Sequence, residues 1–281
     1  MMKIMVIGSG TMGSGIAQVF IANGHQVILR DLNNDSLEKG IKTITKSLDR
    51  KVEKAKITEE EKNETLSRLS KTIDLEEAKD CDLIIEAIVE NMQIKKQLFK
   101  ELDKICKEET IFATNTSSLS ITDLSISTTR AEKVIGMHFF NPAPVMKLVE
   151  VIDGMLTSKE THDTIYKLCT QLDKTPVSVA EAPGFVVNRI LVPMINEAIG
   201  IFAEGIANVE DIDNAMKLGA NHPIGPLALG DLIGLDVCLN IMEVLYSEFG
   251  DSKYRPHPLL RKMVRAGMLG RKSKKGFYDY K

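Results

Sequence analysis

The sequence predicts an α/β protein with a mostly parallel sheet and an inserted helical pair, followed by an all-helical C-terminal domain. Up to residue 182, short apolar runs alternate with helical patterns, which is typical of a parallel sheet covered on both faces. Beyond Pro183-Gly184, strand patterns almost vanish. Because single cores rarely exceed about 250–300 residues, the chain of 281 residues suits two domains, which we place at 1–182 and 183–281.

The N-terminal segment predicts a dinucleotide-binding turn. The apolar run Ile4–Ile7 leads into Gly8-Ser9-Gly10-Thr11-Met12-Gly13, and a helical pattern then reaches Ile21. A second apolar run, Val27–Leu29, leads to Asp31. Strand, glycine turn, helix, strand and acid follow one another as in a Rossmann-type domain. The alternative is an ordinary turn between a strand and a helix, with an acid at the next strand end.

Each part of the turn has an expected role. Gly8 permits the tight turn, Gly10 lets the backbone approach a pyrophosphate, and Gly13 lets the helix lie near the strand. The phosphates would bind at the helix N-terminus, where the first helical residues, Thr11 and Met12, have free N–H groups.

Asp31 favours NAD over NADP as the cofactor. Its carboxylate would accept hydrogen bonds from the ribose hydroxyls of NAD and would repel the 2′-phosphate of NADP. Arg30 precedes it, and neighbouring strand residues point to opposite faces of a sheet. We therefore expect Arg30 to lie outside the cofactor pocket.

The remaining elements follow in chain order. The charged segment 36–56 predicts a long helix, and Thr58-Glu59-Glu60-Glu61 is typical of the capped start of a second, so these form the inserted pair. Strands are expected at 71–73, 82–87, 110–114, 133–137 and 147–152, with a helix at 93–106. In the second domain, helical patterns cover 185–204, 209–218, 227–249 and 258–266.

The composition excludes several classes of protein. A net charge of −3 and a pI near 6.0 indicate no nucleic-acid partner. No apolar run approaches the ~20 residues of a membrane span, and the first strand begins so near Met1 that we expect no signal peptide. Four widely spaced cysteines predict buried reduced thiols and a cytoplasmic location. The histidines lack metal-ligand spacing, so we expect no metal.

A histidine and a glutamate are candidates for acid–base chemistry. His138 follows the strand at 133–137, and ligands of open α/β sheets bind beyond the carboxyl ends of the strands. Glu150 lies in an apolar strand, where a buried carboxylate needs a partner. A return strand would bring Glu150 to His138, fixing the tautomer of a general base for a hydroxyl proton. The alternative is a core histidine and a glutamate at the sheet edge.

Two further polar features fall at expected binding positions. Thr114-Asn115-Thr116-Ser117-Ser118 follows another strand at the same edge and either bonds a substrate oxygen or the nicotinamide, or forms a turn and helix cap. Asn188 comes one turn into the first helix of the second domain, where it either completes the binding site or is solvated.

Taken together, the chain resembles the short-chain L-3-hydroxyacyl-CoA dehydrogenases over nearly its whole length. The resemblance depends on the glycine motif with Asp31, on the Thr114–Ser118 run and on four further segments. These segments are Glu86-Ala87-Ile88-Val89-Glu90-Asn91, His138-Phe139-Phe140-Asn141-Pro142-Ala143-Pro144, Leu148-Val149-Glu150-Val151 and Pro183-Gly184-Phe185-Val186-Val187-Asn188-Arg189. It implies hydride transfer between NAD(H) and C3 of a short-chain 3-hydroxyacyl-CoA such as (S)-3-hydroxybutyryl-CoA.

The resemblance also implies residue roles. His138 matches the general base and Glu150 its orienting partner, while Ser117 and Asn188 match groups that hold the 3-oxygen and the neighbouring acyl carbonyl. The implied cofactor contacts beyond the glycine turn and Asp31 are Ala87, Glu90, Lys95, Ser117, Asn141 and Lys272. Family members are homodimers through the helical domain, so a homodimer is expected here.

A basic stripe is the candidate site for coenzyme A. Lys46, Arg50 and Lys54 repeat at helical spacing on the inserted helix, with Lys51 beside them. They would bind the phosphates of coenzyme A through charge-assisted hydrogen bonds. The alternative is a solvated charged face in which acidic residues of the same helix form intrahelical pairs.

Two classes of function compete. The first is an NAD-dependent dehydrogenase of an acyl-CoA thioester, with a dehydrogenase of free hydroxy acids or sugar acids as its near neighbour. The second is a non-catalytic dinucleotide-binding protein with a structural or sensing role. A pure binding module has no need of His138, Glu150, Ser117 and Asn188 together.

Overall fold

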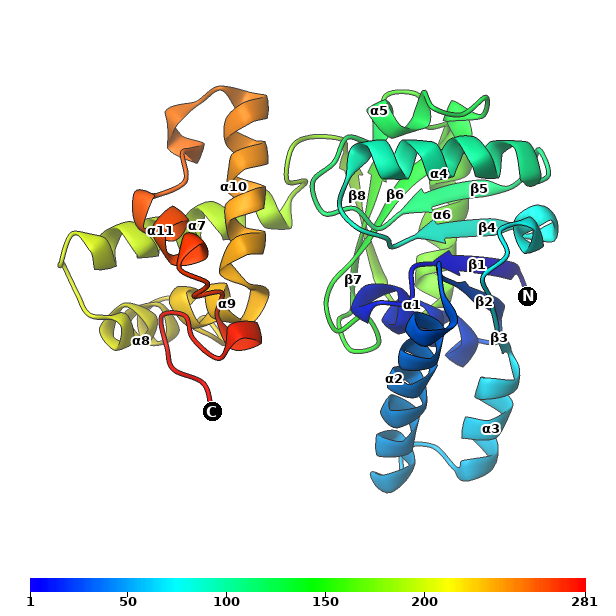
Figure 1. The fold of residues 1–281 in the computed structure, drawn as a ribbon, viewed down its shortest axis with the longest axis horizontal. Coiled ribbons are helices and arrows are strands. Elements are labelled where there is room, and N and C mark those ends of the chain that lie inside the picture. The colour runs from blue at the N-terminus through cyan, green and yellow to red at the C-terminus, as the bar shows by residue number, and fades with distance from the viewer. The chain divides into compact units, whose positions relative to one another are not determined.

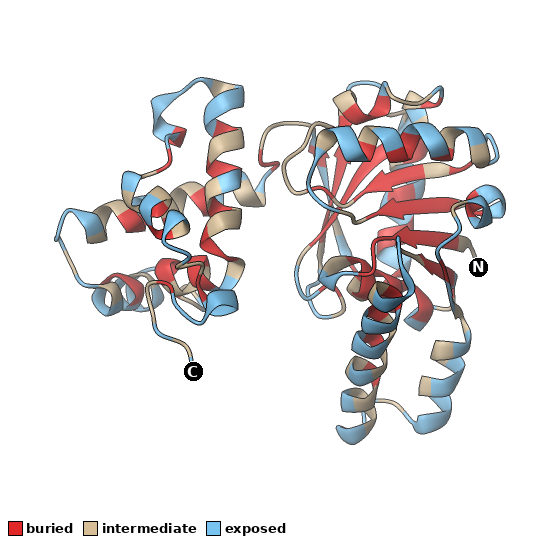
Figure 2. Cartoon of the chain, viewed as in Figure 1, coloured by how far each residue is buried: buried red, intermediate tan, exposed pale blue.

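The computed structural model describes residues Met1 to Lys281, which divide into two compact units, Met1–Glu181 and Ala182–Lys281. Each unit has a buried hydrophobic core of its own. Figure 2 shows that the central strands of the first unit are buried along most of their length, whereas its outer helices are exposed on one side.

The first unit is built on one eight-stranded sheet with the order β3-β2-β1-β4-β5-β6-β7-β8 (Figure 1). The strands are β1 Lys3–Ile7, β2 Gln26–Arg30, β3 Leu69–Thr72, β4 Leu83–Glu86, β5 Ile111–Thr114, β6 Val134–Phe139, β7 Leu148–Asp153 and β8 Thr175–Ala180. Neighbours from β3 to β6 are parallel, β7 is antiparallel to β6, and β8 is parallel to β7. The mostly parallel sheet is therefore confirmed, and so is the expected return strand.

Helices cover this sheet and form the inserted pair. They are α1 Thr11–Ala22, α2 Asn34–Glu53, α3 Glu59–Ser67, α4 Met92–Ile105, α5 Ile121–Ser125 and α6 Lys159–Gln171. The inserted pair, α2 and α3, is confirmed. The capping box at the start of α3 is present, because the Thr58 side chain accepts from Glu61 N at 3.1 Å and the Glu61 carboxylate accepts from Thr58 N at 2.8 Å.

Three elements of the first unit lie outside the predicted set, namely α5, α6 and β8. Strand β8 reads Thr-Pro-Val-Ser-Val-Ala and is mostly exposed, because it is the edge of the sheet. It therefore lacks the buried apolar run by which the other strands are recognised, and Pro176 is tolerated there. Helix α6 buries only a narrow stripe, including Ile165 and Leu168, within a charged sequence.

The second unit is all helical, as predicted. Its helices are α7 Val187–Ala203, α8 Val209–Gly219, α9 Pro226–Ile233, α10 Leu235–Phe249 and α11 Pro258–Arg265. The single helical stretch expected at 227–249 is wrong, because α9 and α10 meet at Gly234, whose φ of 106° favours glycine. No helix in either unit is long and apolar enough to cross a lipid bilayer.

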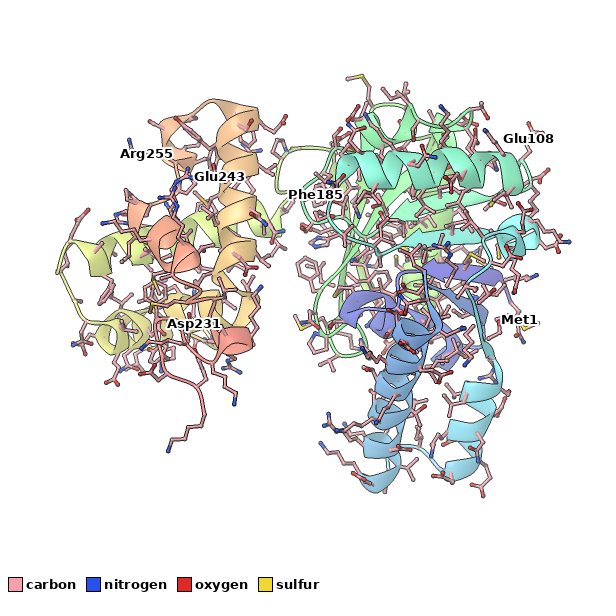
Figure 3. The ribbon with its side chains drawn as sticks, in the orientation of Figure 1. Met1, Glu108, Phe185, Asp231, Glu243 and Arg255 are labelled. Carbon is pink, nitrogen blue, oxygen red and sulfur yellow. The ribbon has the colours of Figure 1, made fainter.

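Two buried aspartates organise the second unit. The Asp213 carboxylate accepts from Leu227 N at 2.8 Å and so caps the first turn of α9. The Asp231 carboxylate, labelled in Figure 3, accepts from Phe277 N at 3.0 Å and from Tyr278 N at 2.9 Å. These charge-assisted hydrogen bonds fix the C-terminal segment to the helices.

The four cysteines are buried and free. Burial raises the pKa of the Cys81 thiol to about 11. Burial likewise raises the pKa of the Cys106, Cys169 and Cys238 thiols to about 12. Neutral thiols of this kind pack as small apolar groups in the cores.

Candidate active site

The glycine turn between β1 and α1 is fixed by close backbone contacts. Gly8 has a φ of +102°, and a Cβ built on it would lie 2.5 Å from the Ala87 carbonyl oxygen. A Cβ on Gly13 would lie 1.7 Å from the Gly8 carbonyl oxygen, so the helix packs directly on the turn. A Cβ on Gly10, in contrast, would meet nothing within 4 Å. The fold explains Gly8 and Gly13, whereas Gly10 faces open space of the kind that a pyrophosphate would fill.

The N-terminus of α1 is suited to an anion. The helix begins at Thr11, with Gly10 as its N-cap and no acidic residue in its first turn. The N–H groups of Thr11, Met12 and Gly13 have no acceptor within the helix, as in every first turn. The uncompensated positive end of the helix dipole therefore faces the space beside Gly10.

A cavity of about 580 Å³ opens beside this turn. Gly8, Gly10, Asp31 and Ala87 line one side, and apolar side chains of α4, including Ile94, line the other. A mostly apolar cavity of this size with a few polar groups at one end is suited to the adenosine half of a dinucleotide.

Asp31 is held in place by three donors. Its Oδ2 accepts from Ser9 N at 2.7 Å and from Ser9 Oγ at 2.6 Å, and its Oδ1 accepts from Leu32 N at 2.7 Å. Burial alone would raise the pKa of this carboxyl, but the bonds from Ser9 and Leu32 outweigh it and lower the pKa. Asp31 is therefore ionised at neutral pH. The sequence pattern assigns Ser9 no role, and its only signal there is its place between Gly8 and Gly10.

The expectation for Arg30 is wrong. Arg30 lines the same cavity as Asp31, and its buried Nε has no hydrogen-bond partner. Alternation fixes only the direction in which a strand residue leaves the sheet. Arg30 is the last residue of β2, so its long side chain can turn over the end of the strand into the cavity.

A buried charge network lies behind the strand ends. Glu86, at the end of β4, is fully buried and accepts from Lys95 Nζ at 2.6 Å, Thr114 Oγ1 at 2.6 Å and Ile88 N at 2.7 Å. Lys95 is 1% exposed, and its Nζ also lies 3.2 Å from Glu90 Oε2. The ammonium of Lys95 therefore lies between two carboxylates, where it orients Glu90.

Glu90 and Ser117 are brought together at the carboxyl edge of the sheet. Glu90 Oε1 accepts from Thr116 Oγ1 at 2.5 Å, Ser117 N at 2.9 Å and Ser117 Oγ at 3.2 Å. Burial alone would raise the pKa of Glu90, but the charge of Lys95 and these hydrogen bonds lower it. The loops after β4 and β5 thus share one ionised carboxylate.

His138 and Glu150 form a cross-strand pair. The antiparallel register of β6 and β7 places the two residues opposite each other. His138 Nδ1 lies 2.8 Å from Glu150 Oε2, and the residues are 6% and 1% exposed. The predicted contact between them is therefore present. Asn115 Oδ1 accepts from Phe139 N at 2.8 Å, which ties the loop after β5 to the end of β6 beside this pair.

Three other predicted site residues do not belong to the contacts described so far. Asn141 lies in the exposed loop after β6, and its peptide bond to Pro142 is cis. Asn188 is the second residue of α7, and Lys272 Nζ lies 2.5 Å from Asp236 Oδ2. Because Asn188 and Lys272 belong to the second unit, their roles toward the residues of the first unit stay predictions.

The basic stripe on α2 is exposed and has no ion pairs. Lys46, Arg50 and Lys54 take part in no salt bridge, and the acidic neighbour Asp49 pairs instead with Lys62 of α3 at 2.7 Å. The intrahelical pairs of the alternative interpretation are therefore not formed. Lys51 separates from the stripe, because it lines a smaller cavity between α2 and α1. No group of His, Cys, Asp and Glu side chains is arranged to hold a metal ion.

The sheet order, the glycine turn and the ionised acid at the end of β2 define the first unit as a dinucleotide-binding domain. Residues 3–182 match the family described as 3-hydroxyacyl-CoA dehydrogenase, NAD binding domain, and residues 184–280 match the 3-hydroxyacyl-CoA dehydrogenase, C-terminal domain. The chain therefore belongs to the 3-hydroxyacyl-CoA dehydrogenase family, and its first unit binds NAD.

Relatives match it over almost its whole length. The 3-hydroxybutyryl-CoA dehydrogenase of Clostridioides difficile is 63% identical over 279 residues, which cover 99% of each chain. The human mitochondrial hydroxyacyl-coenzyme A dehydrogenase is 46% identical, covering 99% of this chain and 91% of that one. Among solved structures, the (S)-3-hydroxybutyryl-CoA dehydrogenase of Ralstonia eutropha superposes with a TM-score of 0.96 at 51% identity, over 99% of each chain.

Proposed function

We propose that this protein interconverts (S)-3-hydroxybutyryl-CoA and acetoacetyl-CoA with NAD(H). The observation that carries the proposal is the buried His138–Glu150 pair, which lies at the carboxyl edge of the sheet that also bears the dinucleotide turn. The names of the relatives support a four-carbon acyl-CoA substrate.

The pair supports a definite proton path. His138 Nδ1 donates to the Glu150 carboxylate, which assigns proton exchange with the substrate to Nε2. During oxidation, Nε2 takes the proton of the 3-hydroxyl, and Glu150 stabilises the imidazolium that forms. During reduction, the same nitrogen returns the proton to the 3-oxygen. NAD, when bound, supplies the acceptor for the hydride that leaves C3.

Other residues are proposed to hold the two ligands. Asp31 takes the adenosine ribose, and the turn from Gly8 to Gly13 takes the pyrophosphate. Glu90 positions Ser117 through two hydrogen bonds, and Ser117 with Asn188 binds the substrate oxygens. Lys272 and Asn141 are carried forward as cofactor contacts, and Lys46, Arg50 and Lys54 as contacts of coenzyme A.

The helical unit supports a homodimer. Several large apolar side chains of that unit are exposed, including Ile190, Ile206 and Leu218 at 68%, 68% and 86%. A second copy would cover such side chains. We also propose a cytoplasmic location, which the four free thiols support.

The direct test is the purified protein with acetoacetyl-CoA and NADH, followed by the near-ultraviolet absorbance of NADH. We expect stoichiometric NADH consumption, with rates falling as the 3-ketoacyl chain is lengthened from four to ten carbons. NADPH should be the poorer donor because Asp31 is ionised, although Arg30 in the same cavity reduces the discrimination.

Free acetoacetate is the control substrate, since it has the reacting ketone without coenzyme A. Turnover of acetoacetate at the rate of the thioester would favour a hydroxy-acid dehydrogenase. No NADH consumption with micromolar protein, together with saturable NADH binding, would favour a non-catalytic sensor.

A further inference from the structure

A second cavity in the first unit has no role in the proposed reaction. It measures about 170 Å³ and lies where α1, the C-terminal half of α2, the loop between β6 and β7, and the end of α6 meet. Its polar lining residues are Gln18, Asn23, Lys51, Lys147, Asp173 and Lys174.

The charges around this cavity do not balance. Lys51, Lys147 and Lys174 supply three positive charges, and Asp173 is the one acidic residue in the lining. Asp173 forms its ion pair with Lys147 at the exposed rim. Lys51 forms no ion pair, so two positive charges remain uncompensated in the protein.

Lys174 is held rigidly at the cavity wall. The residue is 8% exposed, and its Nζ donates to the carbonyl oxygens of Ala143 at 2.6 Å and Met146 at 2.8 Å. These bonds fix the ammonium and leave its third N–H without a protein acceptor. Burial first, and then repulsion by Lys147 and Lys51, lower its pKa despite the attraction of Asp173. The ammonium groups of Lys51, Lys147 and Lys174 therefore repel one another, which destabilises the fold.

A buried amide points to the same conclusion. Gln18 is 3% exposed and lines this cavity, and its Nε2 has no hydrogen-bond partner. Leaving a buried donor unsatisfied destabilises the fold, because the donor has lost its hydrogen bonds to water and gained none in the protein. An acceptor in the cavity would remove that cost and would offset the repulsion among the lysines.

We propose that this cavity binds a phosphate group. A doubly charged phosphate matches the two uncompensated positive charges, and its oxygens would accept from the donors that lack partners. A tetrahedral oxyanion also fits a cavity of about 170 Å³. The phosphate is either a free ion or part of the coenzyme A of the substrate, and only this second source rests on the proposed function.

The test is isothermal titration calorimetry on the full-length protein at fixed ionic strength in a phosphate-free buffer. The titrants are inorganic phosphate, coenzyme A and dephospho-coenzyme A, which lacks only the 3′-phosphate. The variants are Lys51→Gln, which breaks no ion pair, and Gln18→Met, which removes the buried amide whose Nε2 has no hydrogen-bond partner. Lys167→Gln, an exposed lysine of α6 outside this cavity, removes the same charge and serves as the matched control.

We expect saturable binding to the wild type, weakened roughly tenfold or more by each of the two cavity variants and unchanged by Lys167→Gln. Weakening for phosphate alone identifies a free ion as the ligand. Weakening for coenzyme A but not dephospho-coenzyme A identifies the 3′-phosphate, and weakening for both identifies the pyrophosphate. If neither cavity variant weakens the binding of any titrant, the proposal is wrong. This outcome does not depend on which substrate the enzyme turns over.

Discussion

Strand β7 carries two histidine–carboxylate pairs that have the same length and different surroundings. Glu150 pairs with His138 of β6 and Asp153 pairs with His162 of α6, each with 2.8 Å between Nδ1 and the carboxylate oxygen. The side chains of the first pair are 8% and 1% exposed, whereas those of the second are 17% and 37% exposed. Because the two acids are three residues apart in one strand, they point to opposite faces of the sheet.

A hydrogen bond of this kind therefore does not by itself identify a catalytic pair. His162 also uses its second nitrogen within the protein, since Nε2 lies 3.0 Å from Ser178 Oγ, and its ring stacks on Tyr166. The His138 pair is shielded from water, which strengthens its electrostatic interactions, and it lies at the carboxyl edge where ligands bind. Position and burial therefore distinguish the two pairs.

The largest contrast is expected from removing the two rings. His138→Gln should lower kcat by about 10²–10⁴-fold, because the base for the hydroxyl proton is lost. His162→Gln should leave kcat unchanged and serves as the control. Both are measured as NADH consumption with acetoacetyl-CoA, alongside NADH binding, which both variants should retain. Equal activity of the two variants would refute the assignment of His138.

Substituting the two acids should change kcat in the same way as substituting the two histidines, but by a smaller factor. Glu150→Gln keeps the shape of the side chain but no longer stabilises the imidazolium, so we expect kcat to fall by about 10²-fold with little change in KM. Asp153→Asn should not affect kcat. If Glu150→Gln raised KM and left kcat unchanged, Glu150 would only support the fold.

The loss of stability on removing a lysine should likewise depend on how deeply its ion pair is buried. Lys95→Met leaves Glu86 buried without its cation, but Glu86 keeps its bonds from Thr114 and Ile88. We therefore expect a loss of about 2 kcal/mol in urea unfolding, below the ~3–5 kcal/mol typical of a broken buried pair. Lys159→Met, which breaks an exposed pair with Asp163, should cost only a few tenths of a kcal/mol. Similar losses in both would show that burial does not control these pairs.

The smallest expected effect is on the free energy of unfolding at low pH. Burial would raise the pKa of Asp103, but bonds from Thr129 and Arg130 lower it below its ordinary value of 3.8. Ionised Asp103 therefore stabilises the fold above pH 3.8, and this contribution is lost as the pH falls further. Asp103→Asn should flatten the decline of unfolding free energy in that range. Asp163→Asn, at an exposed pair with Lys159, should leave the decline unchanged, and a flattening there would contradict the role of burial.

The parts that could be predicted from the sequence depend on local or unavoidable chemistry. The turn needs glycine at Gly8 and Gly13 because backbone atoms occupy the space of a side chain. The capping box of α3 is set by residues three apart. The acid Glu150 in an apolar strand had to find a partner, which made its contact with His138 predictable.

The parts that could not be predicted depend on how side chains and strands are arranged in space, which the local sequence pattern does not show. Arg30 lines the cavity at the end of β2, where the alternation of strand side chains no longer fixes their direction. Lys95 is buried because Glu86 and Glu90 enclose it. Strand β8 pairs with β7 through its backbone, so its side chains carry little signal.

The burial of the four thiols has a practical consequence for handling the protein. With pKa values of about 11 and 12, on the order of one thiol in 10⁴ or fewer is ionised at neutral pH, and the thiolate is the form that reacts. Alkylating reagents and mild oxidants should therefore leave the folded protein intact. The fold itself, rather than added reductant, would then protect the thiols from oxidation in air. Labelling of these cysteines would report the opening of the cores.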